Sequence, residues 1–327
     1  MKKIFLIQHG AIGDVLMCTP AVRTLRKHFP EAEITFLVET KAFDAVRHNP
    51  NINKFIVPDL QMHFLKYFFF LLKFVFSHYD IVIDFQRNPR SALITFLTNA
   101  KKRISFTGKR RNYAYNIKIK SPDVQIYAVI KKLTLLQPLG INESKDFFLD
   151  FYITQKERNW ANDLWEKMNF KKTDFIIAVS PVSVRSYRVW DAENFAKLCD
   201  HLIEKYKVKI IFTWGPGEYH FIESILLKMK NKPNTNYKIT NIKQLKAIYE
   251  KSSLFIGNDN GPRHIAIISG IPTIGIFSHL YASHWTPPGI RKHIAIQPDK
   301  PGIKNVSLKK VVEVAENSIH NWNENYE

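Results

Sequence analysis

The sequence of 327 residues contains only two cysteines and no long uninterrupted apolar run. Cys18 and Cys199 lie far apart and lack metal-ligand spacing, which excludes a disulfide framework and favours a reducing compartment. The longest apolar stretch, residues 64–76 (FLKYFFFLLKFVF), includes two lysines and is shorter than the ~20 residues of a membrane span. No small-residue cleavage site follows the basic N-terminus, so no signal peptide is expected. We therefore predict a cytoplasmic protein.

Acidic residues are also few, with 29 Asp and Glu against 48 Lys and Arg and a formal net charge of +19. Such a basic surface favours an anionic partner, which could be nucleic acid, an acidic membrane or a phosphorylated substrate. Solubility alone is the alternative explanation. The hydrophobic content of 45% and the charged content of 24% are those of a globular protein, and the length suffices for two domains.

Short apolar runs alternate along the chain with stretches of helical periodicity. The runs cover residues 3–8, 33–39, 80–85 and 103–106 in the first half, and 174–180, 209–215, 253–259 and 272–278 in the second. Continuous apolar strands that alternate with helices are typical of parallel sheets covered on both faces. The pattern predicts an α/β protein with two Rossmann-like domains, residues 1–155 and 174–327, joined by a polar helix over 156–173. A last helix is expected over 307–321.

The segment HGAIGDVL, residues 9–16, follows the first expected strand and contains two glycines before Asp14. It matches neither the Walker loop nor the dinucleotide motif G-x-G-x-x-G. We expect a tight turn at Gly10 and Gly13 and a helix that begins around Asp14. Asp14 then either caps this helix or serves as a general base, because a base needs such rigid placement at the end of a strand.

The segment GNDNGPRHIA, residues 257–266, ends another strand and opens a helix with proline in its first turn. Free amide groups at the start of this helix, with Arg263 and His264 beside them, are typical of a pyrophosphate site. An ordinary strand-to-helix turn is the alternative. Asp259, Asn260 and Gly261 lie in the turn itself.

Two further strand ends in the second half carry polar side chains. Ser183 and Arg188 lie in a loop rich in hydroxyl and guanidinium groups, which suits an anionic ligand, although a solvated charged loop is the alternative. Glu218 follows the turn WGPG at the start of a helix. It could contact a ribose, but its spacing favours a structural role near the positive end of the helix dipole.

Residues 101–120 contain eight basic residues, no acidic residue and three aromatic rings. This segment could stack nucleic-acid bases or bind the phosphates of a lipid-linked sugar. We favour the second reading, because no nucleic-acid-binding module surrounds the segment. The apolar stretch 64–76 is expected to form a buried helix, and a patch on the inner leaflet of a membrane is the alternative.

These segments, in this order and spacing, resemble glycosyltransferase family 9, the bacterial heptosyltransferases of the lipopolysaccharide core. The resemblance covers essentially the whole chain, from HGAIGDVLMCTPAVRTLRKHFPEAEITFLVE through YDIVIDFQRNPRSALIT and KKRISF to SVRSYRVWDAENFAKL, GPGE and GNDNGPRHIA. It implies a GT-B fold, with two Rossmann-like domains whose parallel sheets face each other across a cleft. The acceptor would bind the N-terminal domain and the nucleotide-sugar the C-terminal domain.

The resemblance also implies an inverting transfer of heptose from ADP-heptose to a lipopolysaccharide inner-core acceptor, either Kdo or heptose. Asp14 falls on the proposed catalytic base of the family. The candidate donor-binding residues are Ser183, Arg188, Glu218, Asp259, Asn260, Gly261 and His264, and the candidate acceptor-binding residues are Gly13, Lys101, Lys102, Arg103, Lys109, Arg110 and Arg111. The sequence has no Asp-x-Asp, the usual metal-binding motif of GT-A enzymes, so no metal or cofactor is expected.

Three positions depart from the family pattern. Asn260 replaces a hydroxyl residue, Arg188 replaces a lysine, and Arg263 adds a charge where the family is more often apolar. A planar guanidinium fork does not bind as an ammonium does. The alternatives are therefore a GT-B transferase with another donor or acceptor, a nucleotide-sugar epimerase, and a basic nucleic-acid binder. The expected partners are a nucleotide-sugar, an acidic glycolipid acceptor and the inner-membrane surface, but not nucleic acid.

Overall fold

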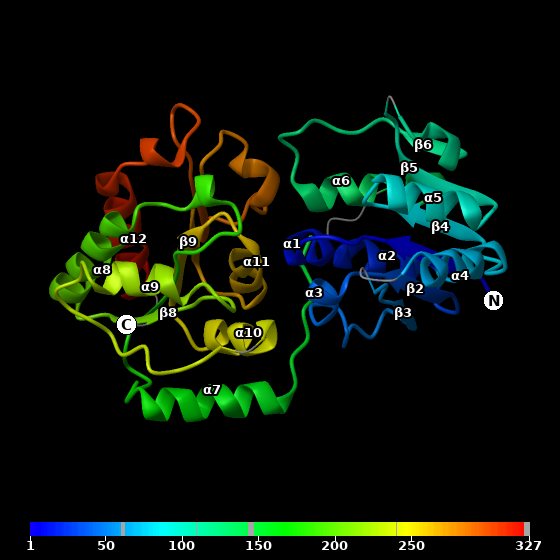
Figure 1. Cartoon of the computed structure of the whole chain (residues 1–327). Coiled ribbons are helices and arrows are strands. Elements are labelled where there is room, and N and C mark those ends of the chain that lie inside the picture. The colour runs from blue at the N-terminus through cyan, green and yellow to red at the C-terminus, as the bar shows by residue number, and fades with distance from the viewer. Residues whose placement is uncertain (60–62, 109, 143–146, 240, 324–327) are drawn as a thin grey trace. The chain divides into compact units, whose positions relative to one another are not determined.

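The computed structural model describes residues 1–59, 63–108, 110–142, 147–239 and 241–323 (Figure 1). The chain divides into two compact units, Met1–Tyr152 and Ile153–Glu327, and each contains its own parallel sheet. Helix α7 (Gln155–Lys167), the polar helix expected in mid-chain, belongs to the second unit. Its first turn is held by a reciprocal pair of hydrogen bonds between Thr154 and Glu157.

The first unit contains a six-stranded sheet in the order β3-β2-β1-β4-β5-β6. The strands are β1 (Lys3–Ile7), β2 (Glu33–Leu37), β3 (Lys54–Ile56), β4 (Ile81–Asp84), β5 (Lys102–Phe106) and β6 (Ile117–Ile119). The helices are α1 (Ile12–Leu16), α2 (Thr19–His28), α3 (Thr40–Phe43), α4 (Phe64–Val75), α5 (Pro89–Leu97) and α6 (Ala128–Thr134), with short 3-10 turns η1 (Asn112–Ala114) and η2 (Gln137–Leu139). All neighbouring strands pair in parallel.

Strand β1 lies in the middle of this sheet and is buried on both faces. Phe5 and Ile7 pack beneath α4, against Phe70 and Phe74, while Ile4 is buried on the opposite face. This two-sided burial explains the continuous apolar run at the start of the sequence. The carboxyl end of β1 therefore leads into the Gly10–Asp14 turn from a rigid central position.

The second unit contains a five-stranded parallel sheet in the order β11-β10-β9-β7-β8. The strands are β7 (Ile176–Ser180), β8 (Lys209–Phe212), β9 (Leu254–Asn258), β10 (Thr273–Ile276) and β11 (His293–Ile296). The remaining elements are α8 (Ala192–Tyr206), α9 (Tyr219–Leu226), α10 (Ile242–Glu250), α11 (Gly261–Ile268), α12 (Leu308–Asn323), η3 (Ser186–Arg188), η4 (Ala282–Trp285) and η5 (Ile303–Asn305). In Figure 1, α8, α9 and α12 lie on one side of this sheet, and α10 and α11 lie on the other.

The eight strands expected from the apolar runs are all present, so the prediction of two parallel α/β units is confirmed. Three strands, β3, β6 and β11, were not expected, and all three lie at a sheet edge. Strands β3, β6 and β11 are short and partly exposed, so they lack a long buried apolar run, whereas the fourth edge strand, β8, has one and was expected. In the described part of the chain, no helix is long and apolar enough to cross a membrane.

Helix α4 differs in part from the expected buried helix. Phe70 and Phe74 are buried against the sheet, but Leu65, Phe68 and Phe69 on the same helix are exposed. Only one side of the helix is therefore covered by the fold.

Candidate active site

The turn after β1 places Asp14 at the carboxyl end of the first sheet. Gly10 adopts a φ of +149°, a region that other residues rarely enter, and α1 begins at Ile12 with Ala11 at its N-cap position. Asp14 is thus inside the first turn of α1, next to the buried Gly13, and it does not cap the helix. The capping interpretation is wrong. Within the described residues, the half-buried Asp14 carboxylate has no hydrogen-bond or ion-pair partner.

Two lysines of α6 lie over the strand ends beside this turn. The Nζ atom of Lys132 donates a 2.8 Å hydrogen bond to Gln8, directly after β1, and lies 5.5 Å above the Phe85 ring, directly after β4. Lys131 lies 5.5 Å above the ring of Phe106, at the end of β5. Burial, followed by the charge of Lys132, lowers the pKa of Lys131. Sequence analysis missed both cations, since they lie in an ordinary helical stretch.

The basic segment 101–120 is divided between the amino-end side and the carboxyl-end side of the first sheet. Lys102 pairs in register with Ile81, which pairs with Ile4 at the amino end of β1. Lys101, Lys102 and Arg103 therefore lie at the amino ends of the strands, whereas Asp14 lies at the carboxyl ends. The structure does not bring them together with Asp14, although we expected one acceptor site. Arg103 instead holds its own loop, donating to the carbonyl oxygens of Ala114 and Ala100 at 3.0 and 2.9 Å.

Arg110 and Arg111 follow the carboxyl end of β5, at the same edge as Asp14, while Lys109 lies outside the described residues. Arg111 donates to the carbonyl oxygen of Arg87 at 3.1 Å, and Arg87 donates to that of Arg110 at 2.7 Å. The loop of Arg87 is in turn fixed by the fully buried Asp84, which accepts from the backbone N–H of Arg87 at 2.8 Å. Three arginines are thus tied together at this edge.

Asp84 acts as an anchor rather than as an exposed acid. Its second carboxylate oxygen accepts a 2.7 Å hydrogen bond from the hydroxyl of Tyr115. Burial raises the pKa of Asp84 above its ordinary value, against the effect of these hydrogen bonds. Asp84 therefore holds the arginine loop through the backbone of Arg87 and, separately, fixes the Tyr115 hydroxyl.

In the second unit, three strand ends converge on Asp259, which directly follows β9. Arg188, from the loop after β7, donates to the Asp259 carboxylate at 2.7 Å. His279, from the loop after β10, contacts the same oxygen through Nε2 at 3.2 Å. Since Nδ1 of His279 accepts from the backbone N–H of Tyr281 at 3.2 Å, Nε2 carries the proton that faces Asp259. Sequence analysis did not identify His279.

Electrostatics keep Asp259 ionised. Burial raises the pKa of Asp259, but the His279 hydrogen bond and the positive charge of Arg188 together outweigh it and hold the pKa below its ordinary value. Arg188 therefore keeps a fixed counter-charge. The Nε atom of Arg188 is buried and makes no hydrogen bond among the described residues. The Nε–H group of Arg188 is therefore a hydrogen-bond donor that the described fold leaves unused. Ser183 lies in the same loop, where its hydroxyl accepts from the backbone N–H of Arg185 at 3.4 Å.

The start of α11 is organised by Asn260. Its side-chain oxygen accepts from the backbone N–H of Arg263 at 3.1 Å, and its amide nitrogen donates to the Val182 carbonyl at 2.7 Å. Asn260 therefore caps the helix and ties it to the loop after β7, while Gly261 forms the first residue of α11. One of the amide groups expected to be free at this helix start is taken by Asn260.

We expected Arg263 and His264 to supply positive charge beside this helix start, but the structure shows that they do not. Arg263 is fully buried and donates to the Trp285 carbonyl and the Thr286 hydroxyl, each at 3.0 Å. His264 is also buried, and burial lowers its pKa to about 4, so its ring is neutral near pH 7. The physical reason is the same for both: their side chains turn into the unit, where α11 packs on η4 and its neighbours.

Glu218 closes its own turn. One carboxylate oxygen accepts from the backbone N–H of Gly215 at 2.7 Å, and Glu218 occupies the N-cap position of α9. This contact is the structural role that the spacing favoured.

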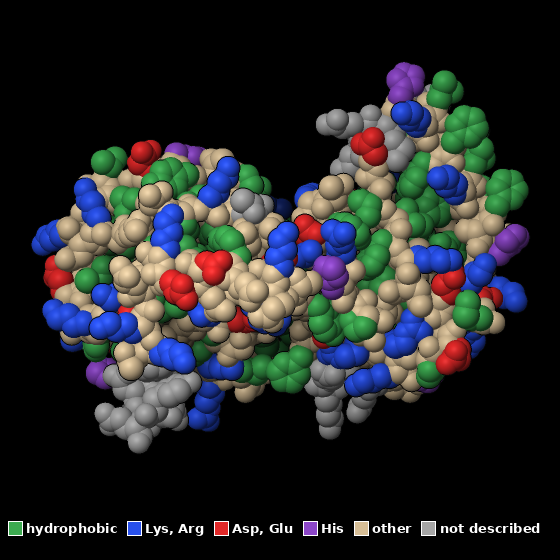
Figure 2. All heavy atoms as spheres, turned by 90° about the horizontal axis from the view of Figure 1, so that it is seen from below, with side chains coloured by type: hydrophobic (Ala, Val, Ile, Leu, Met, Phe, Trp, Pro, Cys, Tyr) green, Lys and Arg blue, Asp and Glu red, His purple; other side chains and the backbone are tan. Residues whose placement is uncertain are grey.

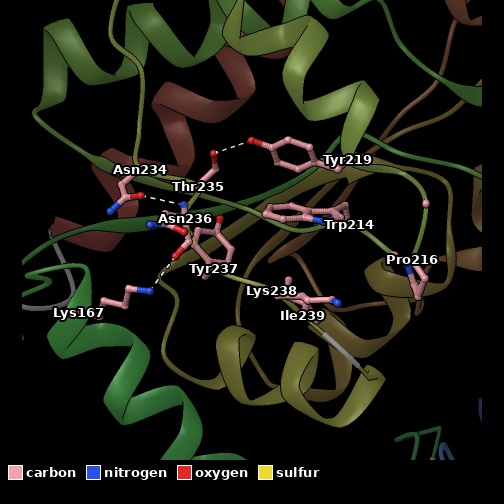
Figure 3. Close-up of a pocket in the computed structure, with 12 residues that line it drawn as sticks. Lys167, Trp214, Pro216, Tyr219, Asn234, Thr235, Asn236, Tyr237, Lys238 and Ile239 are labelled. Atoms are coloured by element: carbon pink, nitrogen blue, oxygen red, sulfur yellow. Dashed lines mark hydrogen bonds between the residues drawn. The ribbon is translucent and has the colours of Figure 1, made fainter.

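An aromatic pocket of about 1120 Å³ opens beside the carboxyl end of β8 (Figure 3). The Trp214 ring lies 5.2 Å from each of the rings of Tyr219 and Tyr237. The hydroxyl groups of Tyr219 and Thr235 are hydrogen-bonded at 3.1 Å, and Lys167 of α7 donates to the Asn236 carbonyl at 3.0 Å. Sequence analysis did not identify this pocket, because its walls come from chain segments far apart in the sequence.

Residues 72–313 match the family described as glycosyltransferase family 9 (heptosyltransferase). Lipopolysaccharide heptosyltransferase 3 of Escherichia coli strain K12 is 27% identical over 293 residues, which cover 84% of this chain and 83% of that protein. The match spans both units.

Two solved structures share the fold. The glycosyl transferase family 9 protein of Veillonella parvula DSM 2008 matches with a TM-score of 0.87 at 22% identity, over 98% of each chain. E. coli ADP-heptose lps heptosyltransferase II matches with a TM-score of 0.78 at 16% identity, over 98% of this chain and 99% of that one. The predicted GT-B class of fold is confirmed.

Proposed function

The chain belongs to glycosyltransferase family 9, the heptosyltransferase family, and on that premise we propose that it transfers heptose from ADP-heptose to a lipopolysaccharide inner-core acceptor, either Kdo or heptose. The names of its E. coli relatives support this donor and this class of acceptor. The observation that carries the proposal is the Asp14 carboxylate, which is rigidly placed at a strand end and left without a partner in the described structure.

The donor diphosphate binds in the second unit, between Arg188, Ser183 and the start of α11 at Gly261. The free side of the Arg188 fork supplies charged hydrogen bonds, and the N-terminal end of α11 adds its dipole. Asp259 and His279 hold the guanidinium group in place. This site stabilises the charge that develops on the leaving diphosphate.

The nucleoside extends from this site toward the aromatic pocket. Strands β9 and β8 both flank β7, so their carboxyl ends lie about 10 Å apart, a separation that a nucleoside diphosphate spans. The Trp214 ring offers a stacking surface to the base. The Glu218 oxygen that does not close the turn faces the ribose hydroxyl groups.

The acceptor binds at the carboxyl edge of the first sheet, where Lys131, Lys132, Arg110 and Arg111 lie near the Asp14 turn. Phosphate and carboxylate groups of an inner-core acceptor complement these four cations. This assignment replaces Lys101, Lys102 and Arg103, which lie at the opposite edge.

Transfer then proceeds by one displacement with inversion. The acceptor hydroxyl oxygen attacks the anomeric carbon as Asp14 takes its proton, and the bond from that carbon to the diphosphate oxygen breaks. The bonding electrons leave with ADP, whose added charge Arg188 stabilises. The sequence has no Asp-x-Asp, and in the proposed metal-independent reaction Arg188 and the start of α11 stabilise the leaving group.

A donor screen followed by an activity assay tests this function. ADP-heptose should raise the melting temperature of the second unit more than UDP- or GDP-sugars do, and truncated lipopolysaccharide should accept heptose in the presence of EDTA. Preference for another nucleotide-sugar would point to a different GT-B transferase. Donor turnover without an acceptor would point to an epimerase, and loss of activity in EDTA would contradict the metal-independent reaction.

A further inference from the structure

Helix α4 presents large apolar side chains to solvent on the side away from the sheet. Phe70 and Phe74 face the core, whereas Leu65, Phe68 and Phe69 are 60%, 49% and 63% exposed. A helix on the surface of a globular protein normally places polar residues on its outer face. The outer side of α4 therefore exposes apolar surface to water, which is unfavourable.

The neighbours of α4 also carry exposed apolar side chains. Helix α5 packs against both α4 and η1, and the exposed rings of Phe96 on α5 and Tyr113 on η1 meet edge to face at 5.7 Å. We use the term aromatic surface for the exposed side chains of Leu65, Phe68, Phe69, Phe76, Phe96 and Tyr113. Exposed apolar side chains gathered on three neighbouring elements are typical of an interaction site.

The chain segment that carries the aromatic surface is rich in basic residues. Residues 61–120 contain twelve Lys and Arg but only two Asp and no Glu, so they carry more than half of the net charge of the chain. Of the two acids, Asp84 is fully buried and Asp80 accepts a backbone hydrogen bond from Lys3. Lys66 and Lys73 of α4 are exposed. Figure 2 shows hydrophobic side chains that project from the first unit next to Lys and Arg side chains.

This combination identifies the chemistry of the partner. Aromatic and aliphatic side chains enter the headgroup region of a bilayer, while lysines beside them extend to the anionic phosphates. A second copy of the same surface fits less well, because two facing copies would bring the lysines of α4 together. With twelve residues, α4 can lie along a bilayer but cannot cross it.

We propose that the aromatic surface docks the first unit onto the interface of an anionic lipid bilayer, with the rings of α4, α5 and η1 inserted among the headgroups. The proposal rests on the proposed function in one respect, because a lipid-linked acceptor would be presented at such an interface. Docking holds the enzyme where its acceptor lies. It does not change the chemistry at Asp14.

Sedimentation of the full chain with vesicles tests the docking surface. The protein should bind phosphatidylglycerol-containing vesicles more tightly than phosphatidylcholine vesicles, and 0.5 M salt should weaken the binding. The double variant Phe68→Ser/Phe69→Ser should lose about tenfold or more of the binding, because both rings insert. The variant Lys66→Gln/Lys73→Gln should lose selectivity for the anionic vesicles.

Matched controls separate this proposal from the proposed function. Leu227→Ser removes an exposed apolar side chain of the second unit, and Lys309→Gln removes an exposed lysine of α12. Both should bind vesicles as the unaltered protein does. Phe68→Ser/Phe69→Ser should retain its melting temperature and full transfer to a deacylated, water-soluble acceptor. Vesicle binding is measured without any transfer reaction. The docking proposal can therefore be confirmed even if the protein transfers no heptose.

Three outcomes would overturn the proposal. Equal binding of Phe68→Ser/Phe69→Ser and the unaltered protein would show that the rings do not insert. Equal binding to neutral and anionic vesicles would remove the role of the lysines. A dimer in light scattering that the double serine variant abolishes, without vesicle binding, would assign the aromatic surface to a second copy of the chain.

Discussion

At the scale of single residues, Asp14 is the group whose loss should stop the reaction. Asp14→Asn keeps the size and helix position of the side chain but cannot accept a proton. We expect kcat for ADP release to fall by about 10²- to 10⁴-fold. The donor-induced melting shift should not change, because the proposed donor site belongs to the second unit. Glu31→Gln, at an exposed acid of the same unit, is the control, and an undiminished rate in Asp14→Asn would refute the assignment.

Arg188 should determine the affinity for the donor diphosphate. Arg188→Lys keeps the charge but loses the planar fork that bonds Asp259 while it leaves Nε open. We expect the Kd for ADP, measured by calorimetry, to rise about 10- to 100-fold, as for the loss of a charged hydrogen bond. Arg291→Lys, at an exposed arginine of the same unit, should bind ADP normally. Unchanged binding by Arg188→Lys would place the diphosphate elsewhere.

Some of these residues could be predicted from the sequence and others could not. Asp14, Arg188 and Asp259 directly follow apolar runs or lie in the loops after them, so strand-end reasoning makes them candidates, and the family resemblance suggests their roles. His279 becomes visible only once β10 is known to lie beside β9, because its partner is twenty residues away. The burial of Arg263 could not be predicted either, since the sequence shows a charge but not which way the side chain turns.

At the scale of secondary-structure elements, sequence reasoning succeeds where burial is two-sided. The central strands and the well-buried edge strand β8 carry continuous apolar runs, while the edge strands β3, β6 and β11 do not. The same logic explains the error over the basic segment 101–120. Its charges were counted as one group, but β5 runs through it and separates Lys102 from Arg111 by the length of the strand.

Helix α6 supplies the next prediction, because it holds two cations over the strand ends near Asp14. In Lys131→Gln/Lys132→Gln, we expect the KM for a phosphorylated acceptor to rise about tenfold, in proportion to the lost charged hydrogen bonds, with the Kd for ADP unchanged. Lys101→Gln/Lys102→Gln makes the same change of charge at the opposite edge and should leave the acceptor KM unchanged. The reverse result would restore Lys101 and Lys102 as the acceptor ligands.

At the scale of the whole molecule, two buried histidines make the stability of the second unit depend on pH. His264 and His293 are buried in the second unit, and burial lowers their pKa values to about 4 and about 3. Both are ordinarily near 6.5 in an unfolded chain. Below pH 6.5 these histidines therefore bind protons in the unfolded state but not in the folded state. The free energy of unfolding consequently falls as the pH drops.

The expected loss is measurable for this unit alone, because all six tryptophans lie beyond residue 153 and report its unfolding by fluorescence. Between pH 7.5 and 5.5, each histidine should cost about 1.4 kcal/mol of the free energy of unfolding in urea. His293→Gln removes one titrating group and should roughly halve this pH-dependent loss, whatever it does to stability at pH 7.5. His220→Gln, at an exposed histidine, should leave the loss intact. If the unfolding free energy were the same at both pH values, the two buried rings would have to be protonated within the fold, and the neutral state assigned to His264 beside the proposed donor site would be wrong.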